Sequence, residues 1–425
     1  MKRDIYALVD CNNFYASCER VFQPDLENKP VGILSNNDGC IVALSNELKK
    51  LNIPRGTPAF KINHLIKKHD IKILSSNYAL YGDMSARVMK TLSQFTPDLE
   101  IYSIDEAFLS LKGFEYLDLT EYGKKIRKTV LQWTGIPTSI GIGPSKTLAK
   151  IAARVAKKYK NYGGVFNIIK HPKMENILKS VEVGKVWGVG PRYAKMLKKN
   201  GINNAYELSQ APDKWVQKRM TIVGLKTAKE LRGISCIDLE MDIDPKKEIV
   251  SSRSFGSPVT ELSDLQEAAA SYCVRAVEKL REENQVASQI MVYLTTNRFR
   301  QNDPQYANYA IAYLPLPSAY TPDFLHAVKR VLKSIYREGY KYKKVGVMIS
   351  DIMHQSKAPL DFFEPTYLDD RRKIIMDCFD MINKKWGSNT LTYINTNTDK
   401  KWKMKREKLS PGFTTNWNEL PIVKA

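Results

Sequence analysis

The chain has no apolar run approaching the roughly 18 to 20 residues needed to cross a membrane, which excludes a membrane-spanning helix. Acidic residues precede any long apolar region at the N-terminus, so no signal peptide is expected. The six cysteines form no CxxC pair and lack the spacing of a disulfide framework. We therefore expect reduced thiols and a cytoplasmic protein.

Low-complexity segments and convincing internal repeats are also missing, so general disorder is not indicated. The hydrophobic content of 43% is enough to form cores, and 425 residues predict two to four domains. Acidic residues are absent from residues 122–170, which contain eleven lysines and arginines. An ordinary solvated helix face is one explanation. The complete absence of acids, together with a net charge of +21, favours a surface that faces the phosphates of a nucleic acid.

Strand and helix patterns alternate over roughly the first 170 residues, as in an α+β or α/β domain. A short apolar strand ends at Asp10. Two apolar segments flank the turn signal Asn-Asn-Asp-Gly and predict a hairpin. The predicted strands are 5–9, 31–35, 40–45, 99–104, 107–111 and 137–143, and the predicted helices are 46–52, 59–69, 121–133 and 145–159.

Asp105 and Glu106 lie side by side between two strand-like segments. A regular strand sends neighbouring side chains to opposite faces, so we expect the strand to break beside this pair, most simply at the end of a hairpin. If Asp10 lies on a neighbouring strand, three carboxylates converge and need a cation to offset their repulsion. Mg²⁺ accepts such oxygen ligands, and two ions can clamp a phosphoryl transfer. Turn caps and surface acids remain the alternative explanation.

The rest of the chain has two further patterned regions. Residues 171–245 are predicted to be helical and basic, and the acidic stretch 238–248 is predicted to be a linker. Residues 249–351 follow the order β-α-β-β-α-β, which is typical of a two-layer α+β sandwich. The residues beyond His354 form a tail with a weaker pattern.

Six motifs, in register, resemble those of Y-family DNA polymerases, and the match is closest to the UmuC-type catalytic subunits of bacterial DNA polymerase V. They are DCNNFYASCE, LSNNDGCIVALSNE, SSNYALYGDMSARVM, IYSIDEAFLSL, GIGPSKTLAKIAARVAKK and VWGVGPRYAKML. The later stretches SSRSFGSPVTEL and WKMKREKLSPGFTTNW extend the resemblance over nearly the whole chain. It implies an α+β multidomain right-hand polymerase: a palm at 1–170 with fingers inserted at about 16–80, a helical thumb with a helix-hairpin-helix at 171–245, a β-α-β-β-α-β little finger at 246–353 and a C-terminal tail at 354–425.

The resemblance also implies an active site. Its catalytic acids fall on Asp10, Asp105 and Glu106, which are implied to bind two Mg²⁺ ions with help from the carbonyl of Cys11. Backbone amides near Asn13 and Phe14 are implied to cradle the triphosphate. Tyr15 resembles the steric gate that excludes a ribose 2′ hydroxyl, although a packed core aromatic is the simpler reading of the residue alone.

Two lysines are implied to contact the triphosphate. Many family members carry a tyrosine and an arginine in the fingers helix, and the matching positions here are Asn46 and Lys49. Lysine supplies a point charge but no bidentate fork, so the resemblance does not fix the exact phosphate contacts. Lys157 matches the family's other phosphate-binding lysine, and both lysines could otherwise be ordinary surface charges.

Other motifs predict contacts with DNA and a sliding clamp. The glycines of WGVG, with the basic residues that follow, suit backbone contacts to DNA phosphates, and SSRSFG suits contact along a template strand. The segment APLDFFE resembles a clamp-binding peptide in which Pro359 replaces the usual glutamine, with a local hydrophobic staple as the alternative. The candidate residues are Gly188, Gly190, Arg192, Lys195, Ser251 and Arg253 for DNA, and Leu360, Phe362 and Phe363 for the clamp.

The resulting hypothesis is an error-prone translesion DNA polymerase that acts in DNA damage tolerance and SOS mutagenesis. Its expected partners are primer-template DNA, a dNTP and a sliding clamp, and the resemblance adds a UmuD-type dimer and RecA. The expected location is the bacterial cytoplasm, in association with the nucleoid. A nucleotide cyclase-like palm enzyme is one alternative, against which the thumb-like and little-finger-like modules argue. A non-catalytic DNA-binding scaffold is another, against which the presence of all three acids argues.

Overall fold

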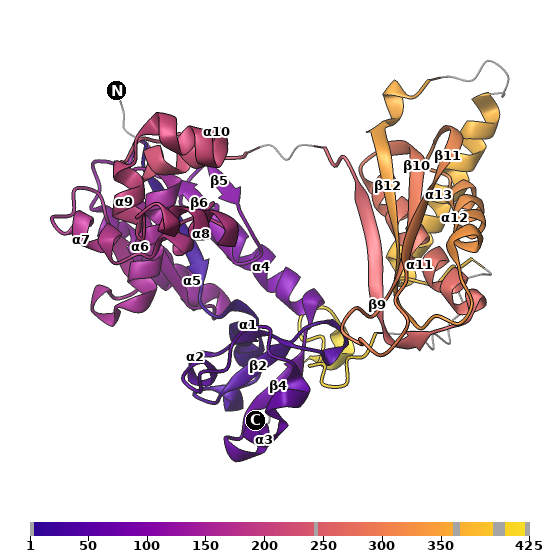
Figure 1. The fold of residues 1–425 in the computed structure, drawn as a ribbon, viewed down its shortest axis with the longest axis horizontal. Coiled ribbons are helices and arrows are strands. Elements are labelled where there is room, and N and C mark those ends of the chain that lie inside the picture. Colours follow the sequence, from indigo (N-terminus) through magenta and orange to yellow (C-terminus); the bar gives the residue numbers. More distant parts are fainter. Residues whose placement is uncertain (1–3, 242–244, 360–365, 394–403, 421–425) are drawn as a thin grey trace. The chain divides into compact units, whose positions relative to one another are not determined.

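The computed structural model describes residues 4–241, 245–359, 366–393 and 404–420 (Figure 1). The chain forms two compact units. No helix in these described ranges is long and apolar enough to cross a membrane. Unit 1 comprises Met1–Ser35, Gly39–Ile243 and Glu407–Ala425, and unit 2 comprises Asn36–Asp38 and Asp244–Arg406.

A five-stranded sheet in the order β5-β6-β1-β7-β8 forms the centre of unit 1. β1 lies between β6 and β7 and is antiparallel to both. The long central strands are mostly buried, in agreement with the apolar runs that predicted them. The strands are β1 (Tyr6–Cys11), β5 (Leu99–Ile101), β6 (Glu106–Ser110), β7 (Thr138–Gly143) and β8 (Val165–Asn167).

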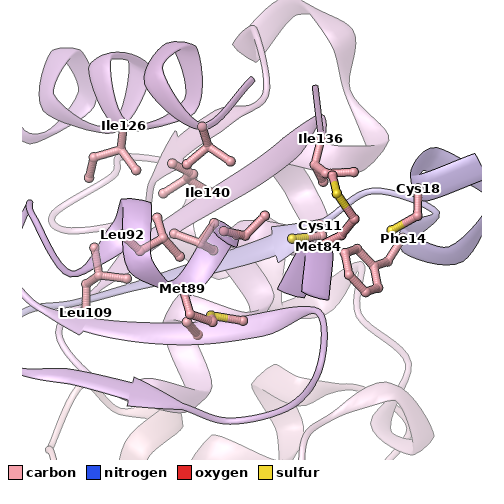
Figure 2. Close-up of a cluster of buried hydrophobic side chains, with 14 of the residues drawn as sticks. Cys11, Phe14, Cys18, Met84, Met89, Leu92, Leu109, Ile126, Ile136 and Ile140 are labelled. Carbon is pink, nitrogen blue, oxygen red and sulfur yellow. The ribbon is translucent and has the colours of Figure 1, made fainter. Parts of the chain in front are cut away.

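Helices cover both faces of this sheet. On one face, α4 (Tyr78–Leu92) and α5 (Leu119–Thr134) pack on the odd-numbered residues of β1. Figure 2 shows this core, in which Leu92 of α4 and Ile126 of α5 lie beside Ile140 of β7.

The opposite face is covered by α6 (Lys146–Lys158), whose Ala149 and Ala153 pack against Leu8 and the neighbouring aromatics. Gly141 of β7 permits this close approach, because a Cβ there would lie 1.9 Å from the backbone nitrogen of Ala153. The basic helix α6 therefore lies directly over β1 and β6, the strands that carry Asp10 and Glu106.

A separate three-stranded sheet has the order β3-β2-β4. β2 and β3 form the predicted antiparallel hairpin. β4, which the sequence reasoning did not predict, runs parallel to β2. The two helices predicted here are shorter than expected, because Asn52 adopts a left-handed φ of 54° and the second helix begins as a 3₁₀ turn. The elements are β2 (Val31–Leu34), β3 (Ile41–Leu44), α2 (Asn46–Lys49), α3 (Asn63–Lys68) and β4 (Lys72–Ser75), and α1 (Phe14–Phe22) follows β1.

The helical region that was predicted from residue 171 onward shares a hydrophobic cluster with one side of α6 and with Phe166 of β8. Its third helix, α9, is N-capped by Asn204, and its last helix, α10, is interrupted at Thr221, where φ is +63°. The helices are α7 (Met174–Lys179), α8 (Pro191–Lys199), α9 (Ala205–Gln210) and α10 (Asp213–Leu231).

Unit 2 confirms the predicted order β-α-β-β-α-β. Its four strands form a sheet in the order β11-β10-β12-β9, and α11 and α12 cover one face of it. The other face carries exposed Tyr309, Ile311 and Tyr313 on β11. The elements are β9 (Ile249–Val259), α11 (Leu262–Glu282), β10 (Gln285–Thr296), β11 (Ala307–Ser318), α12 (Thr321–Ile335), β12 (Tyr342–His354) and α13 (Thr366–Trp386).

Candidate active site

Asp10 and Glu106 face each other across two neighbouring strands. They are a register pair of antiparallel β1 and β6, so their side chains project from the same face of the sheet. Strand alternation places this pair on the side that Leu8 and Phe108 share with α6. The structure therefore brings together two acids that are 96 positions apart in the sequence.

Asp105 lies just outside the regular sheet. β5 ends at Ile101 and β6 begins at Glu106, so the strand breaks at the acid pair as the sequence predicted. Ser103 shapes the turn: its hydroxyl donates to Asp105 Oδ1 at 2.7 Å and accepts from the amides of Asp105 and Glu106 at 3.2 and 3.0 Å. The Asp105 carbonyl accepts from the amide of Cys11 at 2.8 Å. These bonds attach the turn to the end of β1.

Two lysines of α6 contact Asp10 and Glu106. Lys157 Nζ lies 2.7 Å from Asp10 Oδ1, and Lys150 Nζ lies 2.9 Å from Glu106 Oε2. Lys150 also lies over the ring of Tyr102, 4.1 Å from its centroid. Lys157 was predicted from the sequence as a phosphate-binding residue, whereas Lys150 was not. The signal was present in their spacing of seven residues, which places both on one face of a helix.

The oxygen donors of this site suit a hard divalent cation. Burial raises the pKa of the Cys11 thiol, so this residue could offer its carbonyl oxygen rather than a thiolate. Within the described part of the chain, no group of three His, Cys, Asp or Glu side chains is arranged to hold a metal ion. The ammonium groups of Lys150 and Lys157 form ion pairs with two of the three carboxylates, Glu106 and Asp10. A metal ion could bind these carboxylate oxygens only after the two lysines move away from them.

The predicted nucleotide contacts gather at the start of α1. Asn13 caps this helix in a left-handed conformation, with φ at 49°, and Phe14 is its buried first residue. The first amides of a helix have no partner within it, which suits an anion. Lys49 Nζ donates to Asn13 Oδ1 at 2.5 Å. Burial, followed by the charge of Lys157, lowers the pKa of Lys49.

Tyr15 is half-buried and packs against two other tyrosines. Its ring stacks on Tyr81 with centroids 4.4 Å apart and an interplanar angle of 14°. Tyr78 meets it edge-on at 6.3 Å. Burial raises the pKa of Tyr15, so its hydroxyl is neutral at physiological pH. Tyr81 belongs to a motif that carried the resemblance, but sequence reasoning gave it no role.

The glycine hairpin before α8 exposes the predicted DNA-binding residues. Gly188 has a φ of +81°, which a side chain rarely adopts, and Gly190 caps α8 ahead of Pro191. Arg192 and Lys195 are also exposed on that helix. Whether they contact DNA stays a prediction.

The strand β9 requires a correction to one predicted contact. Ser251 pairs with Val347 on the helix-covered face, where its side chain is buried, so it is unavailable to DNA. Ser252 and Ser254 have the opposite orientation and lie toward the open face. Arg253 is exposed. The clamp-binding residues Leu360, Phe362 and Phe363 lie outside the described residues.

Comparisons with known proteins identify the family. The chain matches the impB/mucB/samB family at residues 9–154, the C-terminal domain of that family at 246–362, and a domain of unknown function (DUF4113) at 373–423. It is 42% identical to Protein UmuC of Salmonella typhimurium strain LT2, and 40% identical to Protein ImpB of Salmonella typhimurium. Each alignment covers 99% of this chain and 100% of the relative.

More distant matches extend to other polymerases. DNA polymerase IV of Dehalococcoides mccartyi is 30% identical over 62% of this chain and 66% of that protein. A solved Y-family DNA polymerase chimera, Dbh-Dpo4-Dbh, shares the fold with a TM-score of 0.64 at 19% identity, covering 82% of this chain and 99% of the chimera. The chain therefore belongs to the impB/mucB/samB family, and it is a translesion DNA polymerase of SOS mutagenesis with the Y-family fold.

Proposed function

We propose that Asp10, Asp105 and Glu106 form a two-metal site at which a primer 3′ hydroxyl attacks the α-phosphorus of a dNTP and expels pyrophosphate. The supporting observation is the pairing of Asp10 with Glu106 across adjacent strands, beneath a helix that places two ammonium groups on them. A DNA polymerase requires a divalent metal ion. Mg²⁺ is proposed because every donor here is an oxygen.

Bound Mg²⁺ ions would supply charge neutralisation and a lowered pKa at the 3′ hydroxyl. Residues of the chain itself are proposed to balance the charge of the carboxylates and to bind the triphosphate. Lys150 and Lys157 offset the repulsion between Asp10 and Glu106. Once metal ions take over that role, the two ammonium groups are proposed to turn toward the incoming triphosphate. The amides that begin α1, with Lys49 beside them, offer a second anion-binding surface.

Metal removal tests this proposal directly. We expect the full chain to extend a primer on undamaged and abasic templates with Mg²⁺, and a chelator to abolish extension until excess Mg²⁺ is restored. Binding of primed DNA, measured by fluorescence anisotropy in the same chelated sample, serves as the control. Extension that continues at full rate in the chelator would contradict a metal-dependent site.

The thumb and little finger are proposed to hold the DNA. In the thumb, the supporting features are the exposed glycine hairpin and the exposed basic residues of α8. In unit 2, the open sheet face carries exposed tyrosines, and Ser252 and Ser254 replace Ser251 as the candidate contacts on β9. Contacts of this kind position the nucleic acid without reading its sequence.

A sliding clamp is proposed to bind the segment 359–363. The composition supports this, because an aliphatic residue and two aromatics are the residue types that such an anchor needs. Deleting these residues should reduce stimulation of primer extension by the clamp while basal extension stays unchanged. Equal stimulation of both proteins would favour the local hydrophobic staple. A UmuD-type dimer and RecA stay predictions drawn from the resemblance.

A further inference from the structure

Residues 408–413, hereafter the brace, belong to unit 1 and pack against elements that are more than 300 residues away in the sequence. Lys408 forms two backbone contacts with the end of β4: its amide donates to Ser75 Oγ at 3.0 Å, and its carbonyl accepts from the Ser75 amide at 2.8 Å. Phe413 stacks on Phe22 with centroids 5.0 Å apart and joins the main hydrophobic cluster, where it is 7% exposed. The brace therefore reaches both β4 and α1.

Asn77 connects the brace to the start of α4. Its Oδ1 caps that helix by accepting from the amide of Leu80 at 3.3 Å. Its Nδ2 lies within donating distance of three acceptors of the brace: the carbonyls of Ser410 and Pro411, at 3.2 and 3.1 Å, and Ser410 Oγ at 3.0 Å. Helix N-caps set where a helix begins. The brace thus anchors the residue that positions the first turn of α4.

Glu19 of α1 connects the brace to that turn a second time. Its carboxylate is fully buried and accepts from the Ser410 hydroxyl at 3.1 Å and from the Tyr81 hydroxyl at 2.7 Å, both at Oε1. Gln23 donates to Oε2 at 3.2 Å. Burial raises the pKa of Glu19, and these three donors oppose that rise. A buried acid with three donors is restricted to one geometry.

The two connections converge on Tyr15. Tyr81, held by Glu19, is the ring on which Tyr15 stacks, and Tyr78, in the same turn of α4, meets Tyr15 edge-on. Tyr15 and Glu19 are four residues apart on α1 and therefore lie on one face of that helix. Each aromatic neighbour of Tyr15 on α4 is thus fixed through a residue that the brace contacts.

We propose that the brace holds Tyr78 and Tyr81, the two rings against which Tyr15 packs, in position and thereby sets the selectivity for deoxyribose over ribose. The inference rests on the proposed function, in which Tyr15 is the steric gate beneath the sugar. Ser410 and Phe413 act as positioning residues, because they reach the gate only through Glu19, Tyr81 and α1. The brace gives a role to part of the domain of unknown function that spans residues 373–423.

The test uses the full chain and compares kcat/KM for a dNTP and the matching rNTP on primed DNA. Ser410→Ala and Phe413→Ala should lower the dNTP-to-rNTP ratio on the order of tenfold, since misplacing a contacting group by about 1 Å costs up to about 10²-fold. A smaller fraction of folded enzyme lowers the apparent kcat/KM for both nucleotides by the same factor, so it cannot change this ratio. Trp417→Ala is the matched control, because Trp417 lies just beyond the brace in the described stretch 404–420 and is 85% exposed.

Tyr15→Ala separates the two ideas. If it lowers the ratio while Ser410→Ala and Phe413→Ala leave it at the wild-type value, the brace has no role in selectivity and the inference is overturned. If Tyr15→Ala itself leaves the ratio unchanged, the gate assignment fails and the inference fails with it. Faster amide hydrogen exchange at Ser75 in Phe413→Ala would accompany the expected fall in the ratio, because that amide donates to the brace.

Discussion

Replacing Asp105 by asparagine is expected to lower the rate of nucleotide incorporation by about 10³-fold or more. The carboxylate is one of three proposed metal ligands, and losing a metal-based stabilisation of several kcal/mol in the transition state corresponds to such a factor. Asparagine keeps an oxygen that can accept from the Ser103 hydroxyl, which donates to Asp105 at 2.7 Å. The turn should therefore keep its shape. Single-turnover primer extension with saturating dNTP measures the effect.

The control for this substitution is Asp98→Asn. Asp98 is an exposed carboxylate close to the same hairpin, and it is not part of the proposed site. It should retain the wild-type rate. Both variants should bind primed DNA and melt at the wild-type temperature, since neither change removes buried contacts. Incorporation by Asp105→Asn within tenfold of the wild type would remove Asp105 from the metal site.

Replacing Glu100 by alanine is expected to destabilise unit 1 by about 3–5 kcal/mol. Glu100 Oε2 lies 2.6 Å from Lys146 Nζ, and the two side chains are only 5% and 2% exposed. The alanine variant leaves the ammonium group buried with a carbonyl of Asp238 at 3.1 Å and the ring of Phe108, 4.7 Å from its centroid. Neither supplies a negative charge. Urea denaturation followed by circular dichroism measures the loss.

Two further variants sharpen this experiment. The double substitution Glu100→Leu with Lys146→Met should recover most of the loss, because an apolar pair of similar volume replaces a buried ion pair at little cost. Glu175→Ala removes one partner of an exposed pair with Lys179, and should leave the free energy of unfolding close to the wild-type value. A Glu100→Ala variant as stable as Glu175→Ala would show that the buried pair contributes little.

The buried pair also corrects the reading of the basic stretch 122–170. Lys146 was counted among cations that face phosphates, yet it is buried. Lys146 and Glu100 together hold the segment that follows α10: Lys146 donates to the Asp238 carbonyl at 3.1 Å, and Glu100 accepts from the amide of Glu240 at 3.0 Å. Lys150 and Lys157 pair with Glu106 and Asp10 instead, and their contact with phosphates stays a prediction. Composition alone cannot separate the two kinds of lysine, because it carries no information about burial.

Sequence by itself determined the features that rest on local periodicity. Short stretches of sequence are enough to recognise such features, because strands repeat every two residues and helices every 3.6. They include the break beside Asp105, the β-α-β-β-α-β order of unit 2, and the seven-residue spacing of Lys150 and Lys157. The resemblance of its motifs then pointed to the family. These features were sufficient to single out the acids, but they did not identify Lys150, which contacts Glu106.

Only the tertiary structure decided which distant residues meet and which face each strand presents. Ser251 lies inward because β9 pairs with β12 in one register, and a shift by one residue would have exposed it. Glu100 meets Lys146 across 46 positions, and Glu19 meets Ser410 across 391. Such contacts leave no periodic pattern in the chain. They arise from the way the chain closes on itself, where burial makes each unpaired polar group costly and so selects the partner.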